Sequence, residues 1–299
     1  MKNILVVTGG AGFIGSNLIE LLLVKTKLKI ISIDNYSSGH KKNHLNNIRI
    51  NYIDANTREV SKVLKIYKKN IKALFHFGEF ARIYQSFDKF NECYNSNSIG
   101  SKEVFKFCLD NKIKLIYSAT SASLGNKRND RNLSPYAFTK AKNLELLENF
   151  KNWFNFKFEI IYFYNVYGPR QICKGDMATV IGIFEDHYIN KKDLPVVKPG
   201  TQSRKFTHVK DTVKICYDAW KANKNRHYSI AAKKSYSILD LAKMFKSKIV
   251  FLPKRKGERY ASTLNSVSLN NKICRKIGKI TLKSYIDNFL KKHSFTKNN

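Results

Sequence analysis

Tyr136 and Lys140 are the residues of this sequence whose types and spacing are best suited to chemistry. Ser134 is a good helix N-cap and Pro135 a good first helical residue, so a helix is predicted to begin here with Tyr136 and Lys140 on one face. Dehydrogenation of an alcohol needs a base for the hydroxyl proton, and a tyrosine with a pKa of about 10 serves only if its phenolate is stabilised. The Lys140 ammonium and the positive end of the helix dipole would both lower that pKa.

A hydroxyl-rich segment precedes this helix. Residues 115–118 predict a strand, and Ser118, Thr120 and Ser121 lie at or just beyond its end. Doubly wound folds bind ligands at the carboxyl edge of the sheet, where such a hydroxyl can hold a substrate oxygen. Ordinary turn chemistry also accounts for serine and threonine at a strand end, and the residues alone leave both interpretations open.

A glycine motif near the N-terminus predicts where an oxidising cofactor binds. Gly9, Gly12 and Gly15 have the spacing G-x-x-G-x-x-G directly after the first apolar strand. They would permit a tight turn, close approach of the backbone to a pyrophosphate, and close packing of helix on strand. Asp34 follows about 20 residues later at the end of the second predicted strand, where a carboxylate bonds the ribose hydroxyls of NAD and repels the extra phosphate of NADP. The pattern favours NAD.

Asp54 ends the third predicted strand. Its carboxylate could reach an adenine ring, and a plain turn residue is an equally good explanation.

The elements that must position these residues alternate along the first half of the chain. This alternation predicts a doubly wound parallel sheet with helices on both faces. Beyond Pro169 the pattern becomes irregular, which predicts a smaller lobe over 169–299, interleaved with the last strands of the sheet that 1–168 builds. The predicted strands cover 4–8, 29–34, 50–53, 73–77, 115–118 and 158–163, and the predicted helices cover 13–24, 60–69, 101–111 and 134–153.

The charge of the chain is unusual. Its 299 residues carry 55 Lys and Arg against 22 Asp and Glu, a formal net charge of +33. Such an excess is compatible with nucleic-acid binding. The basic residues occur as scattered doublets, however, and Lys, Asn and Ile are abundant together, as an AT-rich genome would produce. We therefore do not expect nucleic acid to be the main partner.

Other classes are disfavoured by composition. No apolar run approaches the roughly 20 residues of a membrane span, so no membrane partner is expected. The cysteines are far apart without a C-x-x-C pair, which is typical neither of a zinc site nor of a disulfide framework and fits a cytoplasmic protein. We expect no metal, and we interpret His76 as a packing residue at a strand end.

With these motifs in place, the sequence resembles the extended short-chain dehydrogenases/reductases, specifically nucleotide-sugar epimerases of the UDP-glucose 4-epimerase type. The resemblance covers essentially the whole chain and implies a Rossmann-type α/β fold with a smaller C-terminal substrate-binding lobe. The motifs that carry it are T-G-G-A-G-F-I-G-S at 8–16, Asp34-Asn35, His76-Phe77, Asn97-x-x-Gly100, S-P-Y-A-F-T-K at 134–140, Y-N-V-Y-G-P-R at 164–170, R-K-F-T-H-V-K-D at 204–211 and P-K-R-K-G-E at 253–258.

The resemblance implies roles for particular residues. Tyr136 would be the base, Lys140 would bind the nicotinamide ribose and tune Tyr136, and Thr120 would bond the reacting hydroxyl. The diphosphate of a nucleotide-sugar substrate would be held by Asn165, Arg204 and Arg255. The predicted NAD-binding set is Gly9, Gly12, Phe13, Ile14, Gly15, Asp34, Asn35, Asp54, Tyr136 and Lys140. A homodimer is also implied, because the relatives commonly dimerise through two long helices, here around 101–111 and 137–153.

Several departures from the family pattern stand out. Glu79 occupies a position where the family often has a small residue, close to the expected nicotinamide pocket, and the 125–135 loop is short. Lys205 replaces the usual aspartate of Arg-Asp-Phe. Ser121-Ala122 stand where dehydratases carry Asp-Glu, which argues against loss of water at carbon 6. Residues 174–178 are similar to a segment of heptose 6-epimerases, which act on an ADP-linked sugar.

The leading hypothesis is an NAD-dependent epimerase that inverts carbon 4 of a nucleotide-linked hexose, most simply a UDP-hexose, through a transient 4-keto sugar. A net 4-dehydrogenase or reductase and a heptose epimerase are alternatives with the same catalytic residues. A non-catalytic dinucleotide- or RNA-binding protein is the alternative of another class. Retention of Thr120, Tyr136 and Lys140 together argues against the last.

Overall fold

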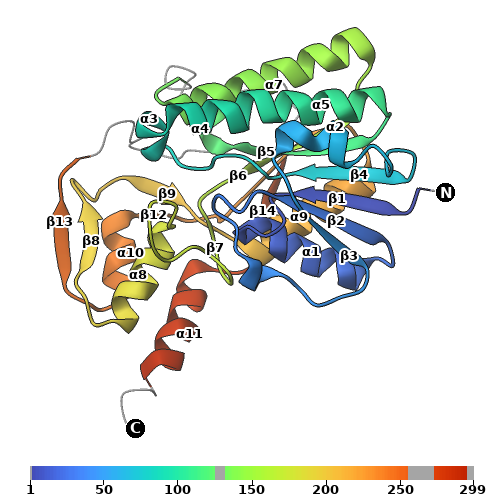
Figure 1. Cartoon of the computed structure of the whole chain (residues 1–299). Coiled ribbons are helices and arrows are strands. Elements are labelled where there is room, and N and C mark those ends of the chain that lie inside the picture. The colour runs from blue at the N-terminus through green and yellow to red at the C-terminus, as the bar shows by residue number, and fades with distance from the viewer. Residues whose placement is uncertain (1, 125–131, 255–272, 295–299) are drawn as a thin grey trace.

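The computed structural model describes residues 2–124, 132–254 and 273–294. Its centre is a sheet of eight strands in the order β14-β11-β6-β5-β4-β1-β2-β3, and the strands pair in parallel (Figure 1). The doubly wound α/β prediction is therefore confirmed. The strands are β1 (Ile4–Thr8), β2 (Lys29–Asp34), β3 (Ile50–Asp54), β4 (Ile71–His76), β5 (Lys114–Thr120), β6 (Phe158–Phe163), β11 (His227–Ala231) and β14 (Ile273–Ile277).

The middle of the sheet is covered on both faces, which is why an inner strand such as β1 is an apolar run without polar alternation. All five residues of β1 are buried, and successive side chains enter different cores: Leu5 and Val7 pack on one side, Val6 on the other. The core with Leu5 includes residues of α1 (Phe13–Lys25) and α9 (Val209–Ala222), and the core with Val6 includes residues of α2 (Val60–Val63), α5 (Ser101–Asp110) and α7 (Pro135–Phe154). Figure 1 shows α5 and α7 on one face and α1 on the other.

The helix expected over 60–69 is much shorter. It is the single turn α2, followed by turns through Asn70 in which Ile66 is 80% exposed. An apolar residue at a helical spacing is a weak signal when no core lies beneath it. Short helical segments also surround the carboxyl edge of the sheet: η1 (Lys41–Asn43), η2 (Thr57–Glu59), α3 (Gln85–Asp88), α4 (Phe90–Tyr94), the π-helical η3 (Asn95–Gly100) and α6 (Ser121–Leu124).

A smaller lobe has its own core, built around Phe184, Phe206 and Phe245. Two strands and one helix that follow residue 168, namely β11, β14 and α9, belong to the main sheet and its cover, so the chain crosses between the two parts repeatedly. The elements of the lobe are α8 (Val180–Ile189), α10 (Ile238–Met244), α11 (Leu282–Ser294) and the strand pairs β7 (Val166–Tyr167) with β10 (Thr207–His208), β8 (Leu194–Val197) with β13 (Ile249–Leu252), and β9 (Ser203–Lys205) with β12 (Ser235–Ser237).

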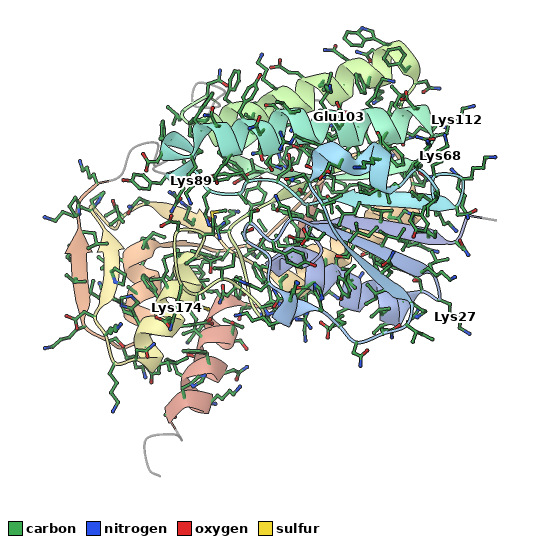
Figure 2. The ribbon with its side chains drawn as sticks, in the orientation of Figure 1. Lys27, Lys68, Lys89, Glu103, Lys112 and Lys174 are labelled. Atoms are coloured by element: carbon green, nitrogen blue, oxygen red, sulfur yellow. The ribbon has the colours of Figure 1, made fainter. Side chains whose placement is uncertain are left out.

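The positive charge is spread over the surface. Lys27, Lys68 and Lys174 are exposed and lie in three different connecting segments at separate places on the molecule (Figure 2). This arrangement is that of a solvated surface that can attract anions in general.

Candidate active site

The glycine motif forms the turn between β1 and α1, and its geometry requires glycine. Gly9 has a φ of +70°, and a Cβ there would lie 2.8 Å from the backbone of Phe77 and Gly78. A Cβ on Gly15 would lie 2.0 Å from the carbonyl oxygen of Gly9. The turn is thus pressed against the loop after β4 and against its own helix. Such a turn brings backbone N–H groups and a helix N-terminus to one place, which suits a pyrophosphate.

Asp34 is buried beside this turn. Its Oδ2 accepts a hydrogen bond from the Ala11 backbone N–H at 2.9 Å, and its Oδ1 accepts one from the Tyr36 N–H at 2.9 Å. Burial raises the pKa of this carboxyl, while the backbone donors, those of Tyr36 and Ala11 first, oppose the rise. The carboxylate is fixed at the end of β2, where the ribose of a dinucleotide would meet it.

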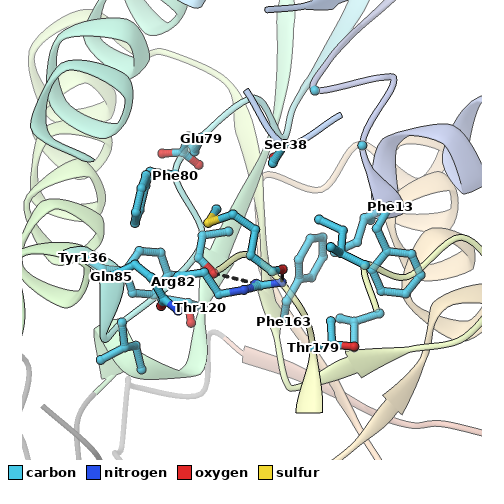
Figure 3. Close-up of a pocket in the computed structure, with 18 of the residues that line it drawn as sticks. Phe13, Ser38, Glu79, Phe80, Arg82, Gln85, Thr120, Tyr136, Phe163 and Thr179 are labelled. Carbon is cyan, nitrogen blue, oxygen red and sulfur yellow. Dashed lines mark hydrogen bonds between the residues drawn. The ribbon is translucent and has the colours of Figure 1, made fainter. Parts of the chain in front are cut away.

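A cavity of about 810 Å³ lies between the carboxyl edge of the sheet and the smaller lobe (Figure 3). Its glycine end comprises the turn of Gly9 to Gly15 with Asp34, and its tyrosine end comprises Tyr136, Glu79, Arg82 and Met177. Among the predicted residues, those that line it are Gly9, Gly12, Phe13, Ile14, Gly15, Asp34, Asn35, Thr120, Tyr136, Lys140, Asn165 and Arg204.

Two of the predicted residues are not brought into this lining. Asp54 is exposed at the end of β3, and its neighbours Ala55, Asn56 and Thr57 line the cavity instead. Arg255 lies outside the described residues, as does the 125–131 part of the short loop.

Tyr136 stands in the first turn of α7. Ser134 caps this helix by accepting a hydrogen bond from the Ala137 N–H at 3.1 Å, so the N-cap prediction is confirmed. Burial raises the pKa of Tyr136 to about 12 in the protein alone; a hydrogen bond with Thr120 and the positive charge of Arg82 act in the opposite direction. Tyr136 and Thr120 both line the cavity wall, and the Thr120 hydroxyl is close enough to lower the pKa of Tyr136, so one alcohol oxygen could contact both.

Lys140 is buried one turn further along α7. Its Nζ donates to the carbonyl oxygen of Ser118 at 2.5 Å, forms an ion pair with Glu79, and lies 4.7 Å from the ring centroid of Tyr117. Burial lowers the pKa of this lysine, and the charge and hydrogen bond of Glu79 oppose that change. The side chains of Lys140 and Glu79 are 5% and 2% exposed, so this is an interior ion pair.

Glu79 is thereby tied into the site. In addition to its pairing with Lys140, its Oε1 accepts hydrogen bonds from Ser101 Oγ at 2.8 Å, Tyr117 OH at 3.0 Å and Asn143 Nδ2 at 3.2 Å. At this position, where the family often has a small residue, this chain therefore has a carboxylate whose two oxygens both accept hydrogen bonds.

His76 connects this cluster to the strand that leads into the glycine turn. Its Nδ1 lies 2.7 Å from Thr8 Oγ1 and its Nε2 lies 2.9 Å from Ser101 Oγ. Burial lowers the pKa of His76 to about 4, so the imidazole is neutral at physiological pH. The residue interpreted as a packing histidine is buried and also hydrogen-bonded at both ring nitrogens.

The loop after β4 and residues 174–178 close over the tyrosine end together. Arg82 donates to the carbonyl oxygen of Met177, and Gln85 Nε2 donates to that of Asp176 at 2.6 Å. Met177 packs against a cluster that contains Phe80 and Tyr136. The sequence patterns did not predict Arg82 as a site residue, and they marked Met177 only as part of the 174–178 segment. The one available signal for Arg82 was its place shortly after a strand end at the carboxyl edge of the sheet.

Asn165 and Arg204 line the cavity from the lobe side. The Asn165 amide donates to the Lys205 carbonyl at 2.9 Å, and Arg204 donates to the Ser203 carbonyl at 3.0 Å. Their predicted contact with a diphosphate stays a prediction. Within the described part of the chain, no group of three or more His, Cys, Asp or Glu side chains is arranged to hold a metal ion, and none of the helices has the length and apolarity of a membrane span.

A parallel sheet whose carboxyl edge holds both a glycine turn and a buried tyrosine beside a threonine hydroxyl is the arrangement of a dinucleotide-dependent enzyme that acts on alcohols. The chain belongs to the NAD dependent epimerase/dehydratase family, whose model matches residues 5–231. The family resemblance found in the sequence is thereby confirmed, as is NAD as the cofactor. The glycine turn at Gly9 to Gly15 suits the pyrophosphate of this cofactor, and the carboxylate of Asp34 suits its ribose.

Particular relatives agree with this placement. The chain is 28% identical over 261 residues, 83% of each protein, to a Methanocaldococcus jannaschii protein named "Putative UDP-glucose 4-epimerase". It is 28% identical over 258 residues to the ADP-L-glycero-D-manno-heptose-6-epimerase of Brachyspira hyodysenteriae, covering 81% of this chain and 80% of that one. Its structure matches the UDP-N-acetylglucosamine 4-epimerase of Methanobrevibacter ruminantium, solved with UDP-N-acetylmuramic acid, with a TM-score of 0.84 and 27% identity over 99% of this chain and 100% of that chain.

Proposed function

We propose that this protein epimerises a nucleotide-linked hexose at carbon 4, with a UDP-hexose as substrate and NAD retained through the cycle. The observation that carries the proposal is that a buried Tyr136 and the Thr120 hydroxyl line one wall of a cavity that also contains the glycine turn and Asp34. The named relatives that act at carbon 4 of UDP-sugars support the substrate class.

In this proposal Tyr136 takes the proton of the carbon-4 hydroxyl, and Thr120 holds the same oxygen through its hydroxyl. NAD, when bound, supplies the hydride acceptor and later the hydride donor. The 4-keto sugar then rotates within the tyrosine end so that hydride returns to its other face. Tyr136 gives the proton back to the carbon-4 oxygen, which completes the other epimer. Asn165 and Arg204 hold the diphosphate meanwhile, since binding energy from the remote nucleotide retains an intermediate that must rotate.

A heptose epimerase is the second candidate. It is favoured by the heptose-6-epimerase relative and by the packing of Met177, from the similar 174–178 segment, against the cluster that contains Tyr136. A net 4-dehydrogenase would use the same residues and would differ only in releasing the keto sugar and NADH.

Turnover assays separate these functions. The NAD-loaded protein is incubated with UDP-glucose, UDP-N-acetylglucosamine or an ADP-heptose, and the products are followed by proton NMR and by NADH absorbance. An epimer of a UDP-hexose without net NADH supports the proposal. Stoichiometric NADH indicates a dehydrogenase, a heptose epimer indicates the second candidate, and no turnover of any of them rejects the proposal.

We also propose a cytoplasmic homodimer. Aromatic side chains on α4 and α7 are partly exposed, including Phe90 at 50%, Trp153 at 63% and Phe154 at 56%, which leaves apolar area for a second copy to cover. Light scattering that finds a monomer at micromolar concentration would reject the dimer.

A further inference from the structure

We propose that Glu79 neutralises Lys140 and that Arg82 supplies the unbalanced positive charge that stabilises the Tyr136 phenolate. The inference rests on the proposed role of Tyr136 as the base. It assigns electrostatic work to Arg82, a residue for which the motifs gave no role, and it gives a purpose to the departure at position 79.

The Glu79–Lys140 pair is the first step. Both side chains are almost fully buried and lie in direct contact, so each compensates the charge of the other. Towards a third group such as Tyr136, a close pair of opposite charges exerts a dipolar field, which is weaker than that of a free ammonium. Lys140 is therefore less effective here as a cation than its place in the motif suggests.

The hydrogen bonds around Glu79 require a carboxylate. Thr8 Oγ1 accepts from the backbone N–H groups of Phe77 and Gly78, both at 3.1 Å, so its own proton donates to His76 Nδ1. The neutral imidazole then carries its proton on Nε2 and donates it to Ser101 Oγ. The Ser101 hydroxyl, in turn, donates to Glu79.

The remaining contacts of Glu79 agree with this direction. Tyr117 donates to Oε1. The Asn143 amide donates one hydrogen to the Asn97 carbonyl oxygen at 2.6 Å and directs the other between Tyr117 OH and Glu79. Each of these neighbours donates, and so does Lys140, which leaves no acceptor for a proton on Glu79. The chain of donors from Thr8 to Ser101 thus fixes a negative charge beside Lys140.

Arg82 is in the opposite situation. Its Nη1 donates to the Ala81 carbonyl at 2.8 Å and its Nη2 to the Met177 carbonyl, while its Nε is buried without a partner. Within the described residues, no carboxylate lies within 4 Å of this guanidinium, and carbonyl oxygens satisfy donors without cancelling a full charge. Burial lowers the pKa of this partly buried arginine to about 10, so the guanidinium is still charged at neutral pH and stabilises an anion that forms near it.

Tyr136 is the group on which these charges act. Arg82 and Tyr136 both line the tyrosine end of the cavity, on the side where Thr120 lies (Figure 3). Burial is the largest influence and raises the pKa of Tyr136; among the charges, Glu79 raises it further and Arg82 lowers it. Substitutions at positions 79 and 82 should therefore move the ionisation of Tyr136 in opposite directions.

The test is an ultraviolet titration of tyrosinate in the NAD-loaded protein, with each variant compared with its own Tyr136→Phe partner so that the difference reports Tyr136 alone. Arg82→Gln, which removes the charge, should move the midpoint up by about one pH unit. Glu79→Gln, which keeps the shape, should move the midpoint down by about the same amount. Lys106→Gln, an exposed lysine on α5, is the control for a lost surface charge and should leave the midpoint in place.

The outcomes separate this inference from the proposed function. An unchanged midpoint in Arg82→Gln, or an unchanged or raised midpoint in Glu79→Gln, overturns the inference even if the enzyme epimerises UDP-hexoses. The predicted opposite shifts in a protein that turns over no nucleotide sugar would sustain the inference and reject the function. If Arg82→Gln does not fold, by circular dichroism, the Glu79→Gln midpoint alone decides.

Discussion

At the glycine end of the cavity, main-chain groups form most of the site: the Gly9 turn presses on the backbone of Phe77 and Gly78, and Asp34 is held by the N–H groups of Ala11 and Tyr36. At the tyrosine end, charged and hydroxyl side chains from distant segments do this work. Lys140 pairs with Glu79, and Arg82 reaches Met177. A site formed by closely packed backbone, such as the turn of Gly9 and Gly15, has no room for an added Cβ. A site formed by side chains can change its charge and shape through substitution. We expect the first end to define the cofactor and the second to adapt to the substrate.

Gly15→Ala should give the largest effect. The new Cβ would lie 2.0 Å from the Gly9 carbonyl oxygen, which cannot move without displacing the turn. We expect NAD affinity to fall by about 100-fold or more, measured by calorimetric titration. Gly278→Ala is the control, because its Cβ would meet a side-chain oxygen of Asp211 at 3.1 Å, away from the cavity lining. Equal NAD affinity in Gly15→Ala and the native protein would refute the backbone cradle.

Thr120→Ala should give the next largest effect. It removes the hydroxyl that lowers the pKa of Tyr136 and would hold the substrate oxygen. We expect kcat to fall by about 10- to 100-fold with a smaller change in KM, because the contact matters most while the proton moves. Thr120→Ser, which keeps the hydroxyl, should recover most of the rate. A change in KM alone would show that Thr120 only binds substrate.

His76 gives a stability prediction at the junction of the two ends. Its pKa is about 4 in the folded protein and about 6.5 when unfolded, so between these values the unfolded state binds more protons. Stability should therefore be complete above about pH 6.5 and should fall as the pH drops towards 4, by up to about 3 kcal/mol.

Thermal unfolding across this range, compared between the native protein and His76→Asn, measures the effect. The variant should be less stable at neutral pH and should lose the part of the pH dependence that belongs to residue 76. Parallel curves for the two proteins would count against a neutral, buried His76.

The smallest effect is expected at the rim of the tyrosine end. Lys89 and Asp176 form an ion pair at 3.4 Å with side chains 39% and 67% exposed. Exposed pairs contribute little, so Lys89→Ala should change the free energy of unfolding by less than about 0.5 kcal/mol and KM less than about twofold. A tenfold rise in KM would place Lys89 in the substrate site.

The same contrast explains what the sequence could predict. Glycine spacing, buried apolar strands such as Ile4–Thr8, and the Ser134 cap express local requirements of the backbone, and these were predicted from local patterns. The partners of Lys140 and Arg82 are Glu79 and the Met177 carbonyl, which are far away along the chain and meet through tertiary packing. A backbone carbonyl leaves no residue-type signature, so Arg82 had no motif to mark it.

Asp54 illustrates a further limit. A strand-end carboxylate is a good candidate for a nucleotide contact, but which of 54–57 line the cavity depends on how the chain leaves β3. The pattern of apolar and polar residues along a strand does not determine the path of the chain after the strand ends. The predicted strands at 4–8, 29–34 and 158–163, by contrast, coincide with β1, β2 and β6, because burial on both faces gives them an unambiguous pattern.

Proton NMR of the NAD-loaded Tyr136→Phe variant with UDP-glucose, beside the native protein, tests the central claim most directly. The substitution removes one oxygen from a buried ring and should leave the fold, judged by circular dichroism, intact. We predict that the native protein forms the carbon-4 epimer and that the variant forms none above a residual about 1,000-fold slower. Epimer formation by the variant at the native rate would contradict the account, because no other described residue is assigned the proton of the carbon-4 hydroxyl.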